Sequence, residues 1–242
     1  MRLWWRVIDL GAVSLVLLLT PSSYGAGARR RLARQVYADT LPTLSGFTAL
    51  AALLCLVLTH IVVVTALSYG LTRYALEMVI RVLVLELIPL TAALFVALRT
   101  TLPSGAQLAR LRETGALAAL RARGIDPVRT EVLPRVVAGV YASVTLAALS
   151  CAVASVMAYL GVYGVTTAGF AAYTRMFGQV FTPAITLVFA LKTLWFGLAV
   201  TLIPLAGGLH APRRPGLAQR GLARLFALLL LIEALSLVGN YY

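Results

Sequence analysis

Charged side chains inside apolar stretches are the residues of this 242-residue sequence best placed to do chemistry. Glu86 lies three residues before Pro89 in one such stretch, and Lys192 lies in the middle of another. A charge at the centre of a membrane helix costs about 2.5–3.5 kcal/mol on insertion scales, so it usually pairs with a partner or faces a polar cavity. We therefore predict that Glu86 and Lys192 either line the polar side of a substrate cavity or form a buried pair that only fixes helix packing.

Other residues in these stretches have less specific interpretations. His60 stands alone in its stretch and is expected to be packed or bonded to another helix rather than to bind a ligand. Glu233 is close enough to the outer end of the last stretch for solvation to suffice. Leu67, Tyr69 and Tyr74 are candidates for lining a substrate cavity, although an aromatic belt at the membrane surface explains the two tyrosines equally well.

Catalysis by this chain is disfavoured. An intramembrane enzyme needs paired groups, such as adjacent carboxylates with a histidine or a serine with a base. The sequence has only two histidines, His210 falls in a loop, and the eight acids are scattered. Cys55 and Cys151 have no CxxC spacing and no neighbouring histidine, so they are expected to be small core residues; a disulfide between them is possible but unsupported. We expect no catalytic residue, no metal ligand and no cofactor.

The elements that carry these residues are long apolar segments. The chain is 61% hydrophobic and 12% charged, whereas a globular protein has about 25% charged residues. Its mean hydropathy is +0.93. Five segments are close to the roughly 20 residues that span a bilayer, and they cover residues 44–69, 79–98, 136–159, 181–205 and 222–238. The predicted fold class is therefore an all-α, polytopic membrane protein with five transmembrane helices.

The net charge of +13 raises the possibility of nucleic-acid binding, so the placement of the cations matters. No aromatic residues interleave with the basic clusters, as a nucleic-acid groove would require, so we expect no nucleic-acid partner. The cations gather before span one, between spans two and three, and between spans four and five: Arg29, Arg30, Arg31 and Arg34; Arg99, Arg110, Arg112, Arg121, Arg123, Arg129 and Arg135; Arg213, Arg214, Arg220 and Arg224. Only Arg73, Arg81 and Arg175 fall in the two opposite loops. The positive-inside rule then predicts a cytoplasmic N-terminus and a C-terminus outside.

The apolar run at residues 10–19 is too short to span comfortably. Trp4 and Trp5 precede it, and tryptophan is enriched at headgroup level. We predict an interfacial elbow helix here.

The connection between spans two and three is too polar to span and too long for a simple turn. Residues 106–123 are expected to be helical, with Gly124 ending the helix in a left-handed conformation. Asp126 can cap the next helix, with Pro127 at its first position. Leu108 and Leu111 share one side of the first helix, while Leu117 and Leu120 point elsewhere. That pattern suits a helix wedged between its own bundle and a partner protein, although an ordinary loop helix fits the geometry equally well.

Three motifs in this connection resemble the MlaE/YrbE permeases of bacterial ABC transporters. They are Ala106-Gln107-Leu108 through Ala119-Leu120-Arg121, Gly124-Ile125-Asp126-Pro127, and Leu133-Pro134-Arg135-Val136-Val137-Ala138. The family typically has AELG-x-M, ALR-x-x-GIDP and VLPR-x-x-A at this spacing. The resemblance extends to Glu86-Leu87-Ile88-Pro89 and to Lys192, and it covers roughly residues 30 to 240. The chain departs from the family at Leu85, where an arginine is common, and within the first motif at Gln107, Ala109, Leu111, Gly115, Ala116 and Ala118.

The resemblance implies one permease domain over residues 1–242: an interfacial region (1–43), spans one and two (44–98), a cytoplasmic coupling region (99–135) and spans three to five (136–242). It also implies a dimer in the bacterial inner membrane that moves phospholipid to or from a periplasmic MCE-domain protein. An ATPase subunit would bind the coupling region and supply the energy, because the chain has no GxxxxGK[ST] loop. The candidates for this coupling are Gln107, Leu108, Leu111, Glu113, Leu117, Leu120, Arg121, Gly124, Asp126 and Pro127. An alternative is a permease-like scaffold that anchors an MCE complex without moving lipid.

Overall fold

The computed structural model describes residues 2–20, 26–70, 72–210 and 217–241, and these residues form helices without strands. In chain order, the α-helices and π-helical segments (η) are α1 (Arg2–Leu19), α2 (Ala26–Ser68), α3 (Thr72–Met78), η2 (Val79–Leu87), α4 (Ile88–Val96), η3 (Ala97–Thr101), α5 (Leu102–Glu113), α6 (Ala116–Ala122), η4 (Val128–Val132), α7 (Leu133–Tyr163), α8 (Phe170–Val180), α9 (Pro183–His210) and α10 (Leu217–Tyr241). Five helical stretches are long and apolar enough to cross a membrane. The predicted all-α polytopic fold is confirmed.

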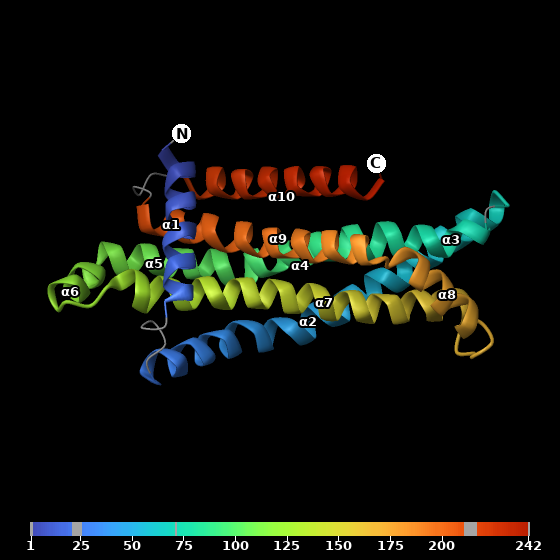
Figure 1. Cartoon of the computed structure of the whole chain (residues 1–242), viewed down its shortest axis with the longest axis horizontal. Helices are drawn as coiled ribbons and strands as arrows, with labels where there is room; N and C mark the ends of the chain where they lie inside the picture. Colours follow the sequence, from blue (N-terminus) through green and yellow to red (C-terminus); the bar gives the residue numbers. More distant parts are fainter. Residues whose placement is uncertain (1, 21–25, 71, 211–216, 242) are drawn as a thin grey trace.

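The five spans run back and forth along one axis (Figure 1). The second span is a single helical stretch from Leu76 to Glu113, and 61% of its most apolar window is buried. The first and last spans bury only 17% of theirs. The second span, α7 and α9 therefore form the centre of the bundle, α2 packs on α7, and α10 packs on α9.

Helix α2 is much longer than a bilayer requires. Its 43 residues extend about 64 Å at 1.5 Å per residue, whereas the hydrocarbon core is about 30 Å thick. The apolar part begins at Leu44, so the basic first part of the helix must extend beyond the hydrocarbon core. His60 is exposed on this helix, and the prediction that it would be packed or bonded to another helix is wrong.

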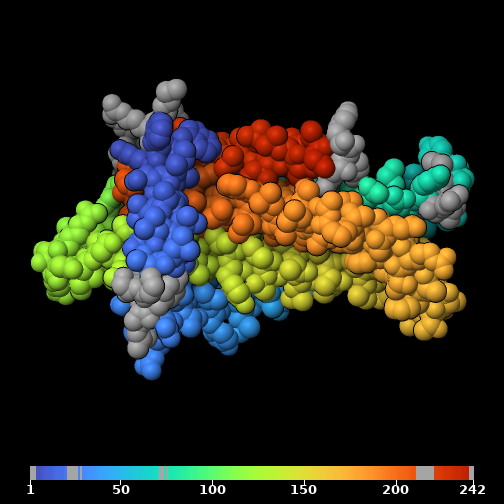
Figure 2. Space-filling model, in the orientation of Figure 1, coloured from blue at the N-terminus to red at the C-terminus, as the bar shows by residue number. Residues whose placement is uncertain are grey.

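Helix α1 crosses the other helices near the end of the bundle from which α5 and α6 project (Figures 1 and 2). It packs against α9, and its Trp5 and Leu19 are largely exposed. A helix that crosses the spans in this way lies where an interfacial helix would lie, so the arrangement is consistent with the predicted elbow.

The loop predicted between spans three and four is in large part a helix. Helix α7 continues to Tyr163, and α8 then folds back at the end of the bundle (Figure 1). The turn needs glycine at two places: Gly164 has φ 67°, and a Cβ on Gly169 would lie 2.2 Å from the Tyr163 ring. Tyr173 then anchors α8 by donating a hydrogen bond to the Ser155 carbonyl at 2.7 Å. Burial raises the pKa of Tyr173 to about 12, so its hydroxyl keeps the proton that it donates.

The basic segments gather at one end of the bundle. The start of α2, the pair α5 and α6, and the start of α10 all lie there (Figure 1). Helices α3 and α8, which carry Arg73 and Arg175, lie at the opposite end. Arg213 and Arg214 fall outside the described residues. The charge asymmetry that the sequence predicts is thus present among the cations whose helices the structure describes.

Candidate functional site

The second span changes its hydrogen-bonding pattern where it carries Glu86. Over η2 the backbone is π-helical, and at its end the Ile88 N–H donates to the carbonyl of Leu83, five residues earlier. Pro89 has no N–H, so one helical donor is missing beside the carbonyls four and five residues before it, Leu85 in an α-helical pattern or Val84 in a π-helical one. π-Helical turns are rare and are often found at functional sites.

Two side chains from neighbouring spans donate hydrogen bonds to these carbonyls. The Cys151 thiol on α7 donates to Val84 at 3.1 Å, and the Lys192 ammonium on α9 donates to Leu85 at 3.3 Å. A buried carbonyl without a donor is costly, and these contacts supply donors at the place where the proline removes one. The spacing of Glu86 and Pro89 thus places a carboxylate and a free carbonyl side by side on one helix.

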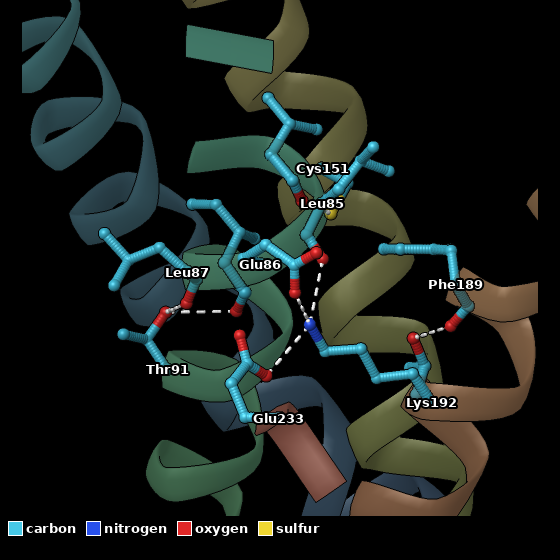
Figure 3. Close-up of polar contacts among 11 residues, drawn as sticks. Leu85, Glu86, Leu87, Thr91, Cys151, Phe189, Lys192 and Glu233 are labelled. Atoms are coloured by element: carbon cyan, nitrogen blue, oxygen red, sulfur yellow. Dashed lines mark hydrogen bonds and ion pairs between the residues drawn. The ribbon is translucent and has the colours of Figure 1, made fainter. Parts of the chain in front are cut away.

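Lys192 forms the centre of a buried ionic cluster (Figure 3). Its ammonium pairs with the Glu86 carboxylate and lies 2.9 Å from the Glu233 carboxylate on α10. The Phe196 ring centroid lies 5.7 Å from the same nitrogen. Glu86 is 6% exposed and Lys192 is 3% exposed. The predicted alternative of a buried Glu86–Lys192 pair therefore describes the contact that the structure contains.

Glu233 is the member of the cluster that the sequence did not reveal. It was expected to be solvated near the outer end of its span, but its side chain is only 13% exposed and it faces Lys192. The reason is the length of α10, which continues to Tyr241. Glu233 thus lies eight residues, or about 12 Å, inside the end of the helix. The two cysteines are free and buried, as expected.

An apolar groove of about 540 Å³ lies between α2 and the start of the second span. Its wall consists of Leu58, Ile61, Val62, Thr65, Ala66, Tyr69, Tyr74, Met78, Val79, Val82, Leu83 and Leu87. The Thr65 hydroxyl donates to the Ile61 carbonyl of its own helix at 2.8 Å, so it adds little polarity. The wall of the groove is therefore almost entirely apolar.

The predicted cavity residues thus occupy two places. Tyr69 and Tyr74 line the groove, whereas Glu86 and Lys192 lie in the ionic cluster. The two places share η2, because Leu87 lines the groove and its neighbour Glu86 faces Lys192. Leu67 is 56% exposed and is not among the described residues that line the groove.

The coupling region is built from two short helices rather than one. Gly115 has φ 74° and separates α5 from α6, a break that the sequence analysis did not predict. Gly124, at φ 73°, ends α6 as expected: its N–H bonds the Arg121 carbonyl, and the Ile125 N–H bonds that of Leu120. The Asp126 carboxylate accepts a hydrogen bond from the Val128 N–H at 3.0 Å, as a cap should.

The break at Gly115 changes which leucines face the bundle. Leu117 joins Leu108 and Leu111 in one apolar cluster with α1, η4 and the end of α9, so the prediction that Leu117 points to another side is wrong. Pro127 is also buried, and Leu120 is half-buried. The remaining coupling candidates are exposed: Gln107, Glu113, Arg121, Gly124 and Asp126. The surface open to a partner is therefore mainly polar.

Helix α5 is fixed closely to α9. A Cβ on Gly105 would lie 2.6 Å from the Pro204 carbonyl oxygen, and one on Gly208 would lie 2.2 Å from that of Gly105. Thr101 donates to the Val200 carbonyl at 2.6 Å, and Arg112 donates to the Leu209 carbonyl at 3.0 Å. The coupling region and the helix that carries Lys192 are thus in direct backbone contact.

Fold and site together define a polytopic helical membrane protein with a buried ionic cluster and an apolar groove at one end of the bundle. Comparison with protein families gives a match to the family described as Permease MlaE, over residues 32–238. The chain belongs to this family and is a membrane permease of an ABC-type transporter. No curated protein matches the chain.

Proposed function

We propose that this permease moves phospholipid between the bacterial inner membrane and a periplasmic MCE-domain protein. The observation that carries the proposal is the apolar groove between α2 and η2, in a chain of the MlaE permease family. A groove with this wall suits hydrocarbon rather than a polar solute, because burial of apolar surface is its main source of affinity. Tyr69 and Tyr74 lie near the end of the groove, and there the polar headgroup of a bound lipid would face the membrane surface.

The energy for transport comes from an ATPase subunit that binds the exposed face of α5 and α6. Arg121 and Gln107 are exposed on this face, while Leu108 and Leu117 hold the two helices to the bundle. The contact between Gly105 and Gly208 supports this route, since a push on α5 displaces the backbone of α9. The permease acts as a dimer, with the coupling end in the cytoplasm and the α3–α8 end in the periplasm.

Purification of the tagged permease from its native membrane, followed by protein and lipid mass spectrometry, tests this function. We expect an ABC ATPase, an MCE-domain protein and phospholipid to be recovered with it. Arg121→Glu should reduce recovery of the ATPase, because it reverses a charge on the exposed face of α6. Arg175→Glu is the matched control, since Arg175 is exposed at the opposite end. If Arg121→Glu recovered the ATPase with full yield and activity, this binding face would be excluded. It would also be excluded if Arg175→Glu lost as much of the ATPase as Arg121→Glu.

A further inference from the structure

Helix α10 packs on α9 through one face, where Leu225 and Leu229 are buried, and leaves most of its surface exposed. Only 17% of its most apolar window is buried, and Leu231, Leu235 and Val238 are each more than half exposed. In a membrane, lipid covers such surfaces as well as another helix does, so apolar contact alone gives little preference for the docked position. Polar contacts between helices then contribute more to the position of α10 than they would in a soluble protein.

Glu233 supplies such a contact at the centre of the bundle. Three oxygens surround the Lys192 ammonium: it donates hydrogen bonds to Glu86 and to the Leu85 carbonyl, and it forms an ion pair with Glu233. The Glu233 carboxyl also lies against that of Glu86. Glu233 therefore joins α10 to α9 and to η2 through one nitrogen (Figure 3).

We propose that Glu233 is a positioning residue that holds α10 against the centre of the bundle through Lys192. The two carboxylates are not equivalent in this role. Glu86 comes from the span with the largest buried share, whereas Glu233 comes from one of the two outer spans. Loss of Glu86 leaves the ionic contact between α9 and α10 intact, whereas loss of Glu233 removes that contact and leaves only the apolar packing between the two helices. The proposal concerns the arrangement of the helices and does not depend on the identity of the cargo.

The position of α10 can be measured with spin labels on α9 and α10. Leu191 is 52% exposed and Leu235 is 64% exposed, so labels at these sites do not disturb the core. Cys55→Ser and Cys151→Ser remove the native thiols and keep a donor at each position. The full chain is reconstituted in lipid nanodiscs and diluted with unlabelled chain, so that the measured distances fall within one molecule.

We expect a narrow distance distribution for the parent chain and for Glu233→Gln, which keeps an oxygen facing Lys192. Glu233→Leu should broaden the distribution and shift it to longer distances. Glu77→Leu is the matched control, because Glu77 pairs with Arg81 on the surface of its own helix. An unchanged distribution in Glu233→Leu, or equal broadening in Glu77→Leu, would overturn the proposal.

A double-mutant cycle separates this role from a general structural one and does not require Glu233→Leu to remain fully stable. If Glu233 acts through Lys192, the Tm of Lys192→Met/Glu233→Leu should be no lower than that of Lys192→Met alone, because the second change also removes a carboxylate that has lost its cation. Additive decreases in Tm would show that Glu233 acts independently of Lys192 and would also overturn the proposal.

Discussion

Lys192 pairs with both Glu86 and Glu233, so its removal should have a large effect. Lys192→Met removes the ammonium that pairs with both carboxylates, and breaking a buried ion pair from one side typically costs about 3–5 kcal/mol. Arg81→Met is the control, because the pair of Arg81 with Glu77 is partly exposed and within one helix; such pairs contribute about 0.3–0.5 kcal/mol. Unfolding of the two variants in detergent, monitored by circular dichroism, measures the loss of stability in each. Similar losses for the two variants would mean that the cluster contributes no more than a surface pair.

Part of the ionic cluster could be predicted from the sequence. Glu86 and Lys192 are opposite charges within predicted spans, and the cost of burying a charge already favours pairing. The contact of Glu233 could not be predicted in the same way, because residue spacing does not show how far a terminal helix continues. The role of Pro89 was also hidden, since it requires knowing which side chains lie opposite the Leu85 and Val84 carbonyls.

At the scale of helices, the coupling region is joined to α9 because the backbone of Gly105 lies close to that of Pro204 and Gly208. Gly105→Ala should lower stability by about 1–3 kcal/mol, because the new methyl group meets the Pro204 backbone oxygen, which cannot move without the helix. Gly46→Ala is the matched control, as no atom lies within 4 Å of the new Cβ. Alanine is the better helix former, so this control should be neutral or more stable by about 0.5–1 kcal/mol. Thermal unfolding of both variants in the same nanodiscs makes the comparison. Equal stability of Gly105→Ala and Gly46→Ala would show that α5 and α9 can move apart without a loss of stability.

The elements themselves were largely predictable. All five spans lie where the apolar segments predict them, because length and hydropathy decide which segments can cross a bilayer. Two features, one in the coupling region and one in the turns, could not be predicted. The break at Gly115 and the helix α8 depend on backbone conformations and tertiary contacts, such as the fit of Tyr163 against Gly169, that a hydropathy pattern does not contain.

For the whole molecule, the charge distribution predicts an orientation that labelling can test. Ala119 is exposed on α6, and Val165 is 95% exposed in the turn before α8 at the other end. In spheroplasts, a membrane-impermeant maleimide should label Val165→Cys and not Ala119→Cys. Both should react after the membrane is permeabilised. Cys55 and Cys151 are buried and give little background. Labelling of Ala119→Cys in intact spheroplasts would reverse the proposed orientation.

Lipid transfer by a permease with a blocked groove tests the central proposal most directly. Ala66 lines the groove, so Ala66→Trp should fill part of it; Ala49, exposed on the same helix and outside the groove, provides the matched control Ala49→Trp. ATP-dependent transfer of labelled phospholipid is measured with the complete complex in proteoliposomes. We predict that Ala66→Trp abolishes most of the transfer while the complex still assembles, and that Ala49→Trp transfers lipid normally. Undiminished transfer by Ala66→Trp would contradict a lipid path through the groove, and an absence of transfer by the unmodified complex would favour a scaffold.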